Sequence, residues 1–172
     1  MLKYYAAKYL PNKLSRRDTI YEKKQLDKSI KLYKQKKYYT RKNIVSYPHK
    51  VSNHILRARR VYKLEHIIPS KELSKKTGCS IRALQQIESK GEGAYYSSGS
   101  RPNQTAQSWG RARLASAITG GKSAAVDFKI LDKGCNHNSS KAYKMAIKAI
   151  KKHGYGTRRV PKSHYSKKIN TK

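Results

Sequence analysis

The balance of charge constrains this chain more than any other feature of its sequence. Its 172 residues include 41 Lys and Arg against 9 Asp and Glu, which gives a formal net charge of +32 at pH 7. A folded domain with so much like charge repels itself, whereas a net charge of about 2–8 is enough to keep a small domain in solution. We therefore expect the native chain to lie against a polyanion, or within an assembly that supplies the opposite charge.

The apolar content sets a second limit. Hydrophobic residues make up 37% of the chain, which is enough for one modest core. No run approaches the roughly 18 apolar residues of a membrane span, and the first residues, MLKYYAAKYLPNK, are too polar for a signal peptide. We expect a protein that is made inside a cell and is not secreted. Cys79 and Cys135 are interpreted as ordinary thiols, without a metal or cofactor.

The first part of the chain, residues 1–65, is expected to be a basic arm. It holds 19 Lys and Arg against 4 acidic residues, and nine of the fourteen tyrosines, but few aliphatic residues. Such a composition favours a segment that drapes over a partner. Ser15 followed by Asp18 predicts the start of one helix, which extends to the lysines at 34–37. A second helix is predicted over 53–62.

Residues 66–154 are expected to form a small, mainly α core. Serine caps and glycine stops predict helices over 70–78, from Ser80 to near Gly91, from 103 or 105 to 120–121, over 123–131 and over 140–153. No segment alternates with a period of two, so no sheet is indicated. Residues 155–172, with six Lys and Arg and no acidic residue, are expected to be a basic tail.

The stretch from Leu73 to Ile87 has the pattern of a helix-turn-helix. Gly78 would form the turn, and the apolar residues would form the face on which the two helices cross: Leu73, Cys79, Leu84 and Ile87. In a DNA-binding version the second helix would present four polar residues to base edges in the major groove: Ser80, Arg82, Gln85 and Gln86. A purely structural helical hairpin, closed by glycine, fits the same pattern.

A glycine-rich segment from Gly91 to Leu114 follows. Its glycines, its small hydroxyl residues and Arg101-Pro102 indicate tight backbone geometry with a row of polar groups. The candidate partner or nucleic-acid contacts in and after it are Tyr95, Tyr96, Arg101, Asn103, Gln104, Arg111, Arg113 and Lys122. Trp109 is expected to anchor the next helix in the core, and Arg101 to make a specific contact through its guanidinium. A plain connector whose side chains satisfy its own backbone is the alternative.

Catalysis is not indicated by this sequence. The nine carboxylates are scattered, without a pair spaced for general acid and base work and without a cluster of metal ligands. The segment 91–114 lacks the closing Gly-Lys-Ser/Thr of a phosphate-binding loop, and no strand precedes it as a dinucleotide site would require. We therefore expect a protein that is not an enzyme.

Five segments resemble an uncharacterised domain family of nucleocytoplasmic large DNA viruses: 36–41, 72–78, 93–105, 108–116 and 120–127. The likeness extends from about Tyr9 to Cys135, and its core of glycine, tyrosine, serine, arginine and proline within 93–105 is specific. The resemblance implies a viral origin. It implies no activity, so the mechanism has to be inferred from the residues.

Three functions are compatible with these observations. In the first, which is the function we expect, the chain is a minor capsid protein of the virion, on the inner face of the shell, which bridges capsomers. Its partners would be the major capsid protein and other minor capsid proteins, with packaged DNA or the inner membrane surface as further polyanions. The second is a DNA-binding protein, either a genome-condensing factor or a helix-turn-helix regulator. The third, a nucleic-acid-processing enzyme, has the least support.

Overall fold

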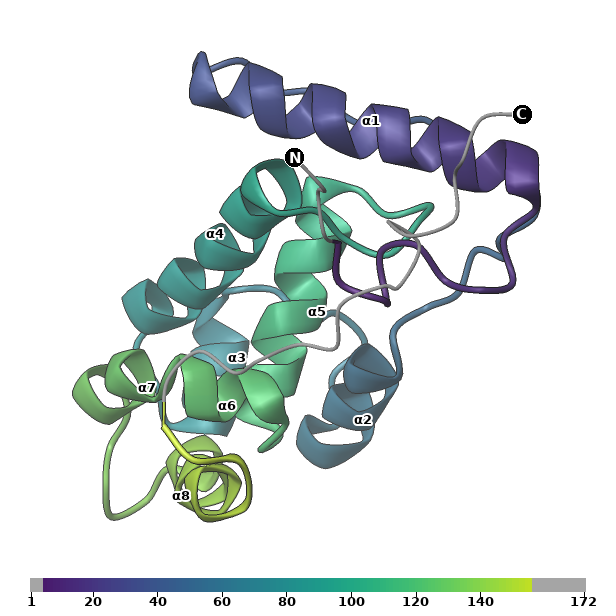
Figure 1. Ribbon diagram of the computed structural model, residues 1–172. Helices are drawn as coiled ribbons and strands as arrows, with labels where there is room; N and C mark the ends of the chain where they lie inside the picture. Colours follow the sequence, from purple (N-terminus) through teal and green to yellow (C-terminus); the bar gives the residue numbers. More distant parts are fainter. Residues whose placement is uncertain (1–4, 156–172) are drawn as a thin grey trace. The chain divides into compact units, whose positions relative to one another are not determined.

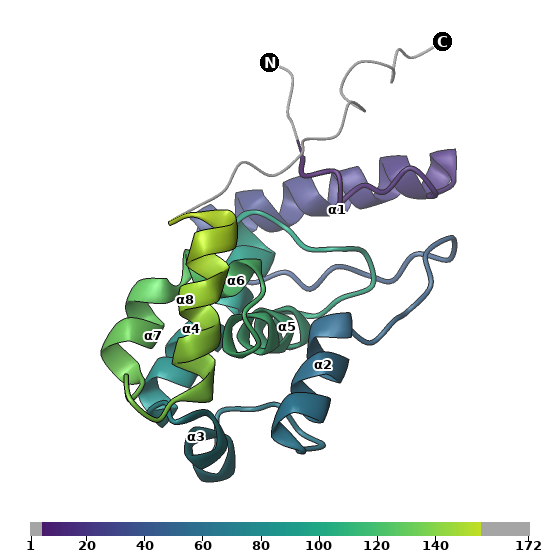
Figure 2. The ribbon, with the colours of Figure 1, turned by 90° about the horizontal axis from the view of Figure 1, so that it is seen from below.

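The computed structural model describes residues 5–155, and within this part nearly all regular structure is helical (Figures 1 and 2). This confirms the expected mainly α fold. The helices are α1 Arg16–Lys34, α2 Asn53–Tyr62, α3 Lys71–Thr77, α4 Ile81–Ser97, α5 Ala106–Ile118, α6 Lys122–Val126, α7 Phe128–Gly134 and α8 Lys141–His153. Within the described range, none of these helices has the length and apolar character that a bilayer crossing requires.

Serine side chains begin several of these helices, as the sequence predicts. The hydroxyl of Ser15 accepts from the amide of Asp18 at 3.1 Å, and Ser70 accepts from Leu73 at the same distance. Ser140 does the same for α8. Each hydroxyl satisfies one of the amides that the first turn of a helix leaves unpaired.

Two predicted helix boundaries are wrong. Helix α4 does not end near Gly91 but continues to Ser97. Gly91 lies inside the helix because α5 crosses there: a Cβ on Gly91 would lie 2.6 Å from the Cα of Gly110. The helix predicted over 123–131 is two short helices, α6 and α7, which meet at Asp127.

The described residues divide into two compact units. The first unit comprises 5–49 and 94–105, and the second comprises 50–93 and 106–155. Helix α2, which was expected in the arm, therefore belongs to the second unit. The loop 98–105, which was expected in the core, belongs to the first.

The second unit has an aliphatic core. Helix α5 packs against α2, α6 and α8, and Figure 2 looks along α5 with α2 on one side and α6 and α8 on the other. The core is built from leucines, isoleucines and alanines: Leu73, Leu84, Ile87, Leu114, Ala115, Ala117, Ile118, Ala124, Ala125, Leu131, Ala142 and Ala146. The small alanines let the helix axes approach closely.

Cys79 and Cys135 form a disulfide in the second unit, so the interpretation as ordinary thiols is wrong. The two residues also form an isolated antiparallel bridge. The amide of Ser80 donates to the carbonyl of Gly134 at 2.7 Å, and Asn136 donates to Gly78 at 2.9 Å. Because the cysteines are 56 residues apart, only the packing of α3, α4 and α7 brings them together.

The first unit has a small cluster of its own, which joins the start of the chain to α1 and to the segment after it. The buried apolar residues are Tyr5, Leu10, Leu14, Leu26 and Ile44. Polar residues are buried with them, and Gln25 pairs with the backbone of Lys42: its Oε1 accepts at 2.6 Å and its Nε2 donates at 3.0 Å. The segment expected as an arm therefore contains a packed nucleus.

Candidate nucleic-acid interface

The apolar residues that were predicted to form the helix-turn-helix contact face belong to the core of the second unit. Leu73, Cys79, Leu84 and Ile87 are all buried in its core. Gly78 ends α3 with a left-handed φ of +73°, and a Cβ there would lie 2.8 Å from the Cα of Ser140. Only glycine fits both the conformation and the close approach. The turn between α3 and α4 is therefore held by the segment that precedes α8.

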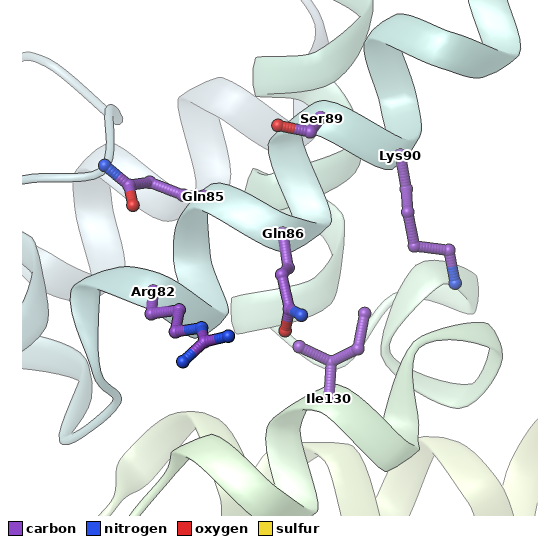
Figure 3. A pocket seen from close by; sticks show the side chains of 6 residues that line it. All are labelled: Arg82, Gln85, Gln86, Ser89, Lys90 and Ile130. Atoms are coloured by element: carbon purple, nitrogen blue, oxygen red, sulfur yellow. The ribbon is translucent and has the colours of Figure 1, made fainter.

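The outer face of α4 is polar and exposed. Arg82, Gln85, Gln86, Ser89 and Lys90 line a shallow pocket of about 310 Å³, together with Ile130 of α7 (Figure 3). The burial of Ala83, Leu84 and Ile87 on the opposite face explains this orientation, because helical spacing sends the intervening residues outward. The three predicted base-reading residues of α4 thus lie on one surface.

The residues of this surface form two rows along the helix. Arg82, Gln86 and Lys90 are four residues apart and follow one row, on the side where Ile130 lies. Figure 3 shows the side chain of Gln86 pointing toward Ile130, whereas Gln85 leaves the helix on another side. Within residues 5–155 the Arg82 guanidinium has no ion-pair partner, so its donors remain available to a ligand.

Lys90 differs from Arg82 because it is paired within the unit. Its Nζ lies 2.7 Å from Oδ1 of Asp127, a carboxylate that is fully buried. Arg113 donates to both oxygens of the same carboxylate, from Nε at 2.7 Å and from Nη2 at 2.8 Å. Arg113, a predicted contact residue, is therefore engaged in a forked ion pair that joins α5 to the junction of α6 and α7.

The remaining predicted residues of the second unit lie apart from this surface or serve the fold. Ser80 caps α4, since its hydroxyl accepts from the amide of Ala83 at 3.2 Å. Arg111 is exposed on α5 and pairs loosely with Glu88 at 3.8 Å. Burial and the nearby Glu92 raise the pKa of Glu88, while Arg111 lowers it. Lys122 is exposed in the first turn of α6.

The glycine-rich loop 98–105 lies in the first unit, where Asn103 bonds to the backbone of another segment rather than to that of the loop itself. The side chain of Asn103 accepts from the amide of Ile44 at 2.7 Å and donates to the carbonyls of Ile44 and Tyr47 at 3.0 and 2.6 Å. Gly99 has a φ of +117°, and a Cβ there would lie 2.7 Å from Leu26. The loop thus joins the end of α4 to α1 and to the segment 44–47.

Arg41 and Tyr95 form the buried centre of the first unit. The Arg41 guanidinium lies 4.3 Å from the centre of the Tyr95 ring, and the Arg41 amide donates to the Tyr95 hydroxyl at 2.9 Å. Arg41 also donates to Ser100 and lies 3.2 Å from Glu22. Burial raises the pKa of Tyr95. Tyr95, a predicted contact residue, is therefore inaccessible to a ligand.

The other predicted residues of this segment are more accessible. Arg101 is exposed, and its side chain has no ion-pair partner among residues 5–155. Tyr96 and Gln104 are half-buried. Trp109, expected to anchor the core, is half-buried within α5 and belongs to neither buried cluster. Its neighbour Gly110 lies at the close crossing with α4.

Sequence reasoning missed Ser89, Lys90 and Ile130 as parts of the α4 surface. Ser89 and Lys90 follow Gln85 and Gln86 by four residues, a spacing that the predicted helix already contained. Ile130 comes from α7 and has no local signal. In the described part of the chain, no group of three or more His, Cys, Asp or Glu side chains could hold a metal ion.

Comparison with known proteins places the chain in a family. Residues 2–138 match the model of a family of unknown function (DUF5824), and the chain belongs to that family. Neither the comparison with curated proteins nor the comparison with solved structures finds a match.

Proposed function

We propose that this chain is a non-enzymatic protein that binds duplex DNA, with α4 as the helix that enters the major groove. The observation that supports the proposal most is that Arg82, Gln85 and Gln86 are all exposed on α4, the second helix of the predicted helix-turn-helix, whose other face is buried. The residues at the start of such a helix are the ones that reach base edges.

The chemistry of these side chains suits bases. A guanidinium fork can donate to O6 and N7 of guanine, and a glutamine amide can pair with N6 and N7 of adenine. Arg82 has no competing ion pair among the described residues, so its fork can turn toward a base. The disulfide and the Gly78 contact fix the turn, which holds α4 in one orientation for docking.

The net charge of +32 would supply most of the affinity, independent of sequence. Contacts of Lys and Arg with phosphates release counterions, so the affinity depends on salt. If about 6–10 phosphates are neutralised, the affinity for duplex DNA should fall by roughly 10³–10⁵ between 50 and 200 mM salt. A tight complex whose affinity does not change with salt would contradict this electrostatic origin.

The test separates base recognition from charge. The double variant Gln85→Ala/Gln86→Ala leaves the charge unchanged, so a loss of discrimination between duplex sequences would come from base contacts. We expect a loss of about 1–3 kcal/mol for each contact. Arg82→Ala is compared with Arg59→Ala, which removes the same charge from an exposed position of α2. Sequences are first selected from a random duplex library, and the affinities are measured by fluorescence anisotropy.

Two outcomes would contradict the proposal. In one, Arg82→Ala and Arg59→Ala weaken binding equally and the glutamine variant has no effect, so that α4 has no special role. In the other, the chain binds an acidic polypeptide as tightly as DNA at equal salt. That result would instead favour the minor capsid role, in which the basic chain meets acidic capsid surfaces.

The minor capsid role stays a prediction that rests on the charge and on the viral resemblance. Purified virions test it: the chain should be present at a fixed copy number and occupy repeated icosahedral positions inside the shell. Its absence from purified particles would contradict it.

A further inference from the structure

We infer that the first unit carries a second nucleic-acid site, a tyrosine platform formed by Tyr33, Tyr38 and Tyr96, which stacks on the unpaired bases of a single strand. This inference goes beyond the proposed duplex binding by α4, because the platform lies in the other unit and recognises a different form of nucleic acid. None of the groups on α4 that would read a duplex takes part in it.

The three rings form one aromatic surface. Tyr33 and Tyr96 are nearly parallel, with ring centres 6.1 Å apart and an interplanar angle of 9°. Tyr38 meets both edge-on, at 6.1 Å from Tyr33 and 5.1 Å from Tyr96. Tyr38 is 70% exposed, so its ring gains little from burial and is open to a further aromatic partner. Exposed aromatic rings are the surfaces on which proteins stack single-stranded bases.

The platform is held rigidly by the buried centre of the unit. Tyr96 packs edge-on against Tyr95, with ring centres 5.0 Å apart, and Tyr95 is fixed under the guanidinium of Arg41. The hydroxyl of Ser29 on α1 donates to the carbonyl of Tyr96 at 3.4 Å. A rigid platform loses little conformational freedom when a base binds, which favours affinity.

The turn beside the platform presents exposed lysines that follow Asp27, the last acidic residue of α1. Lys31, Lys34, Lys36 and Lys37 are exposed, and no acidic residue occurs in 28–64 or in 94–105. Lys31 and Lys34 lie in the last turn of α1, where positive charge also complements the helix dipole. That role does not explain Lys36 and Lys37, which follow the helix.

Lys36 occupies a position that normally belongs to glycine. Its φ is +59°, its amide donates to the carbonyl of Tyr33 at 2.9 Å, and the amide of Lys37 donates to Leu32 at 3.0 Å. These two bonds are the closing pattern of a helix whose left-handed residue is usually glycine. A lysine there costs stability, and a phosphate contact beside the aromatic rings is a function that would explain its presence.

The test compares a short oligo(dT), a short oligo(U), an abasic strand of equal length and charge, and a hairpin duplex. Tyr38→Ala should weaken binding to oligo(dT) and oligo(U) by about 5-fold to 150-fold, the range for loss of one stacked base. It should leave affinity for the abasic strand and the duplex within about two-fold, since phosphate contacts dominate there. Tyr38→Phe keeps the ring and should bind like the native chain.

Two further variants keep the result interpretable. Tyr21→Ala removes an exposed tyrosine of α1 that lies outside the platform and is 40% exposed, and it should not change binding. Lys36→Gly should weaken binding of the three single strands, the abasic one included, while the thermal midpoint stays equal or rises, an outcome that a purely structural lysine would not produce. An oligonucleotide with 5-iodouracil, crosslinked by light, should label Tyr38 or Tyr96 in peptide mapping.

The inference fails if folded Tyr38→Ala binds oligo(dT) and oligo(U) as tightly as the native chain. It also fails if the affinity for the abasic strand falls by the same factor as the affinity for oligo(dT). If Tyr38→Ala weakened binding of an acidic polypeptide as much as binding of oligo(dT), the surface would be a protein-binding one. The α4 variants Arg82→Ala and Gln85→Ala/Gln86→Ala should leave binding to oligo(dT) unchanged. Failure of the platform and failure of the proposed duplex binding are therefore distinguishable.

Discussion

Each unit of the molecule buries a carboxylate, but the cations that pair with it are partly exposed in one unit and buried in the other. In the second unit Asp127 receives bonds from Lys90 and Arg113, whose side chains reach solvent at 49% and 21% exposure. In the first unit Glu22 and Arg41 are only 1% and 3% exposed, and Oε1 of Glu22 has no hydrogen bond among the described residues. The second unit places its ions at the edge of an aliphatic core, whereas the first places them at its centre.

This difference predicts which changes destabilise each unit. An aliphatic core loses stability in proportion to the area that is uncovered. A buried polar network depends on every member, because one missing partner leaves a charge or a dipole unsatisfied in a medium of low dielectric constant. We therefore expect the first unit to be sensitive to single polar substitutions and to pH, and the second to packing and to reduction.

The largest expected effect is the loss of Arg41. Arg41→Ala removes the partner of Glu22, the ring contact with Tyr95 and the bond to Ser100, and should destabilise the first unit by about 3–5 kcal/mol above pH 7, where Glu22 ionises. Hydrogen exchange, read separately for each unit, measures it. Arg59→Ala is the control, with an expected change within about 0.5 kcal/mol. Unaltered protection in 5–49 would contradict a polar centre.

Reduction of the disulfide should affect the other unit. Cys79 and Cys135 close a loop of 56 residues, so reduction should destabilise the second unit by about 2–4 kcal/mol and leave exchange in the first unit unchanged. The double variant Cys79→Ala/Cys135→Ala provides the control, because a reductant should no longer change its stability. A thermal midpoint that is the same with and without reductant would show that packing alone holds the turn.

The pH dependence should distinguish the two units. Burial raises the pKa of Glu22 from 4.5 to about 7, against the opposing effects of Arg41 and Gln25. The folded state then binds more protons than the unfolded state in this range, so the stability of the first unit should fall as pH rises from 4.5 to 7, by about 2–3 kcal/mol. Exchange measured across this range, with Glu22→Gln as control, tests it. A slope that persists in Glu22→Gln would assign the effect to another group.

The smallest expected effect concerns the crossing of α4 and α5. Alanine favours a helix over glycine by about 1 kcal/mol, yet Gly110→Ala would place its Cβ 2.7 Å from the carbonyl oxygen of Glu88. We expect a net destabilisation of the second unit of about 1–3 kcal/mol, measured by chemical denaturation. A stabilised variant would mean that α4 and α5 can move apart at no cost in stability. The aliphatic core would then accept the added methyl group, and the second unit would be less sensitive to packing than we expect.

Local signals predicted much of the fold. Ser15, Ser70 and Ser140 begin helices where the sequence places them, because a cap is a contact between residues three apart. The same holds for Gly78, whose left-handed conformation follows from its position after α3. Errors arose where a residue serves a distant partner: Gly91 was interpreted as a stop, although it accommodates Gly110.

The candidate sites divide in the same way. Arg82, Gln85 and Gln86 were predicted because their spacing on one helix decides which way they face. The disulfide and the tyrosine platform were not predicted, since Cys79 meets Cys135 and Tyr38 meets Tyr96 only after folding. The charge of the chain showed that a polyanion is expected, but it could not distinguish duplex from single strand.

The contacts of the α3–α4 turn affect when this turn can fold during synthesis. Gly78 and Ser80 are held by Gly134, Asn136 and Ser140, which the ribosome adds more than fifty residues later. At about 5–20 residues per second, synthesis of that stretch takes roughly 3–12 seconds. During this interval α3 and α4 can form as helices, but their turn lacks the neighbours that hold it. A nascent chain stalled before Ser140 should therefore show helical signal without the binding surface of α4.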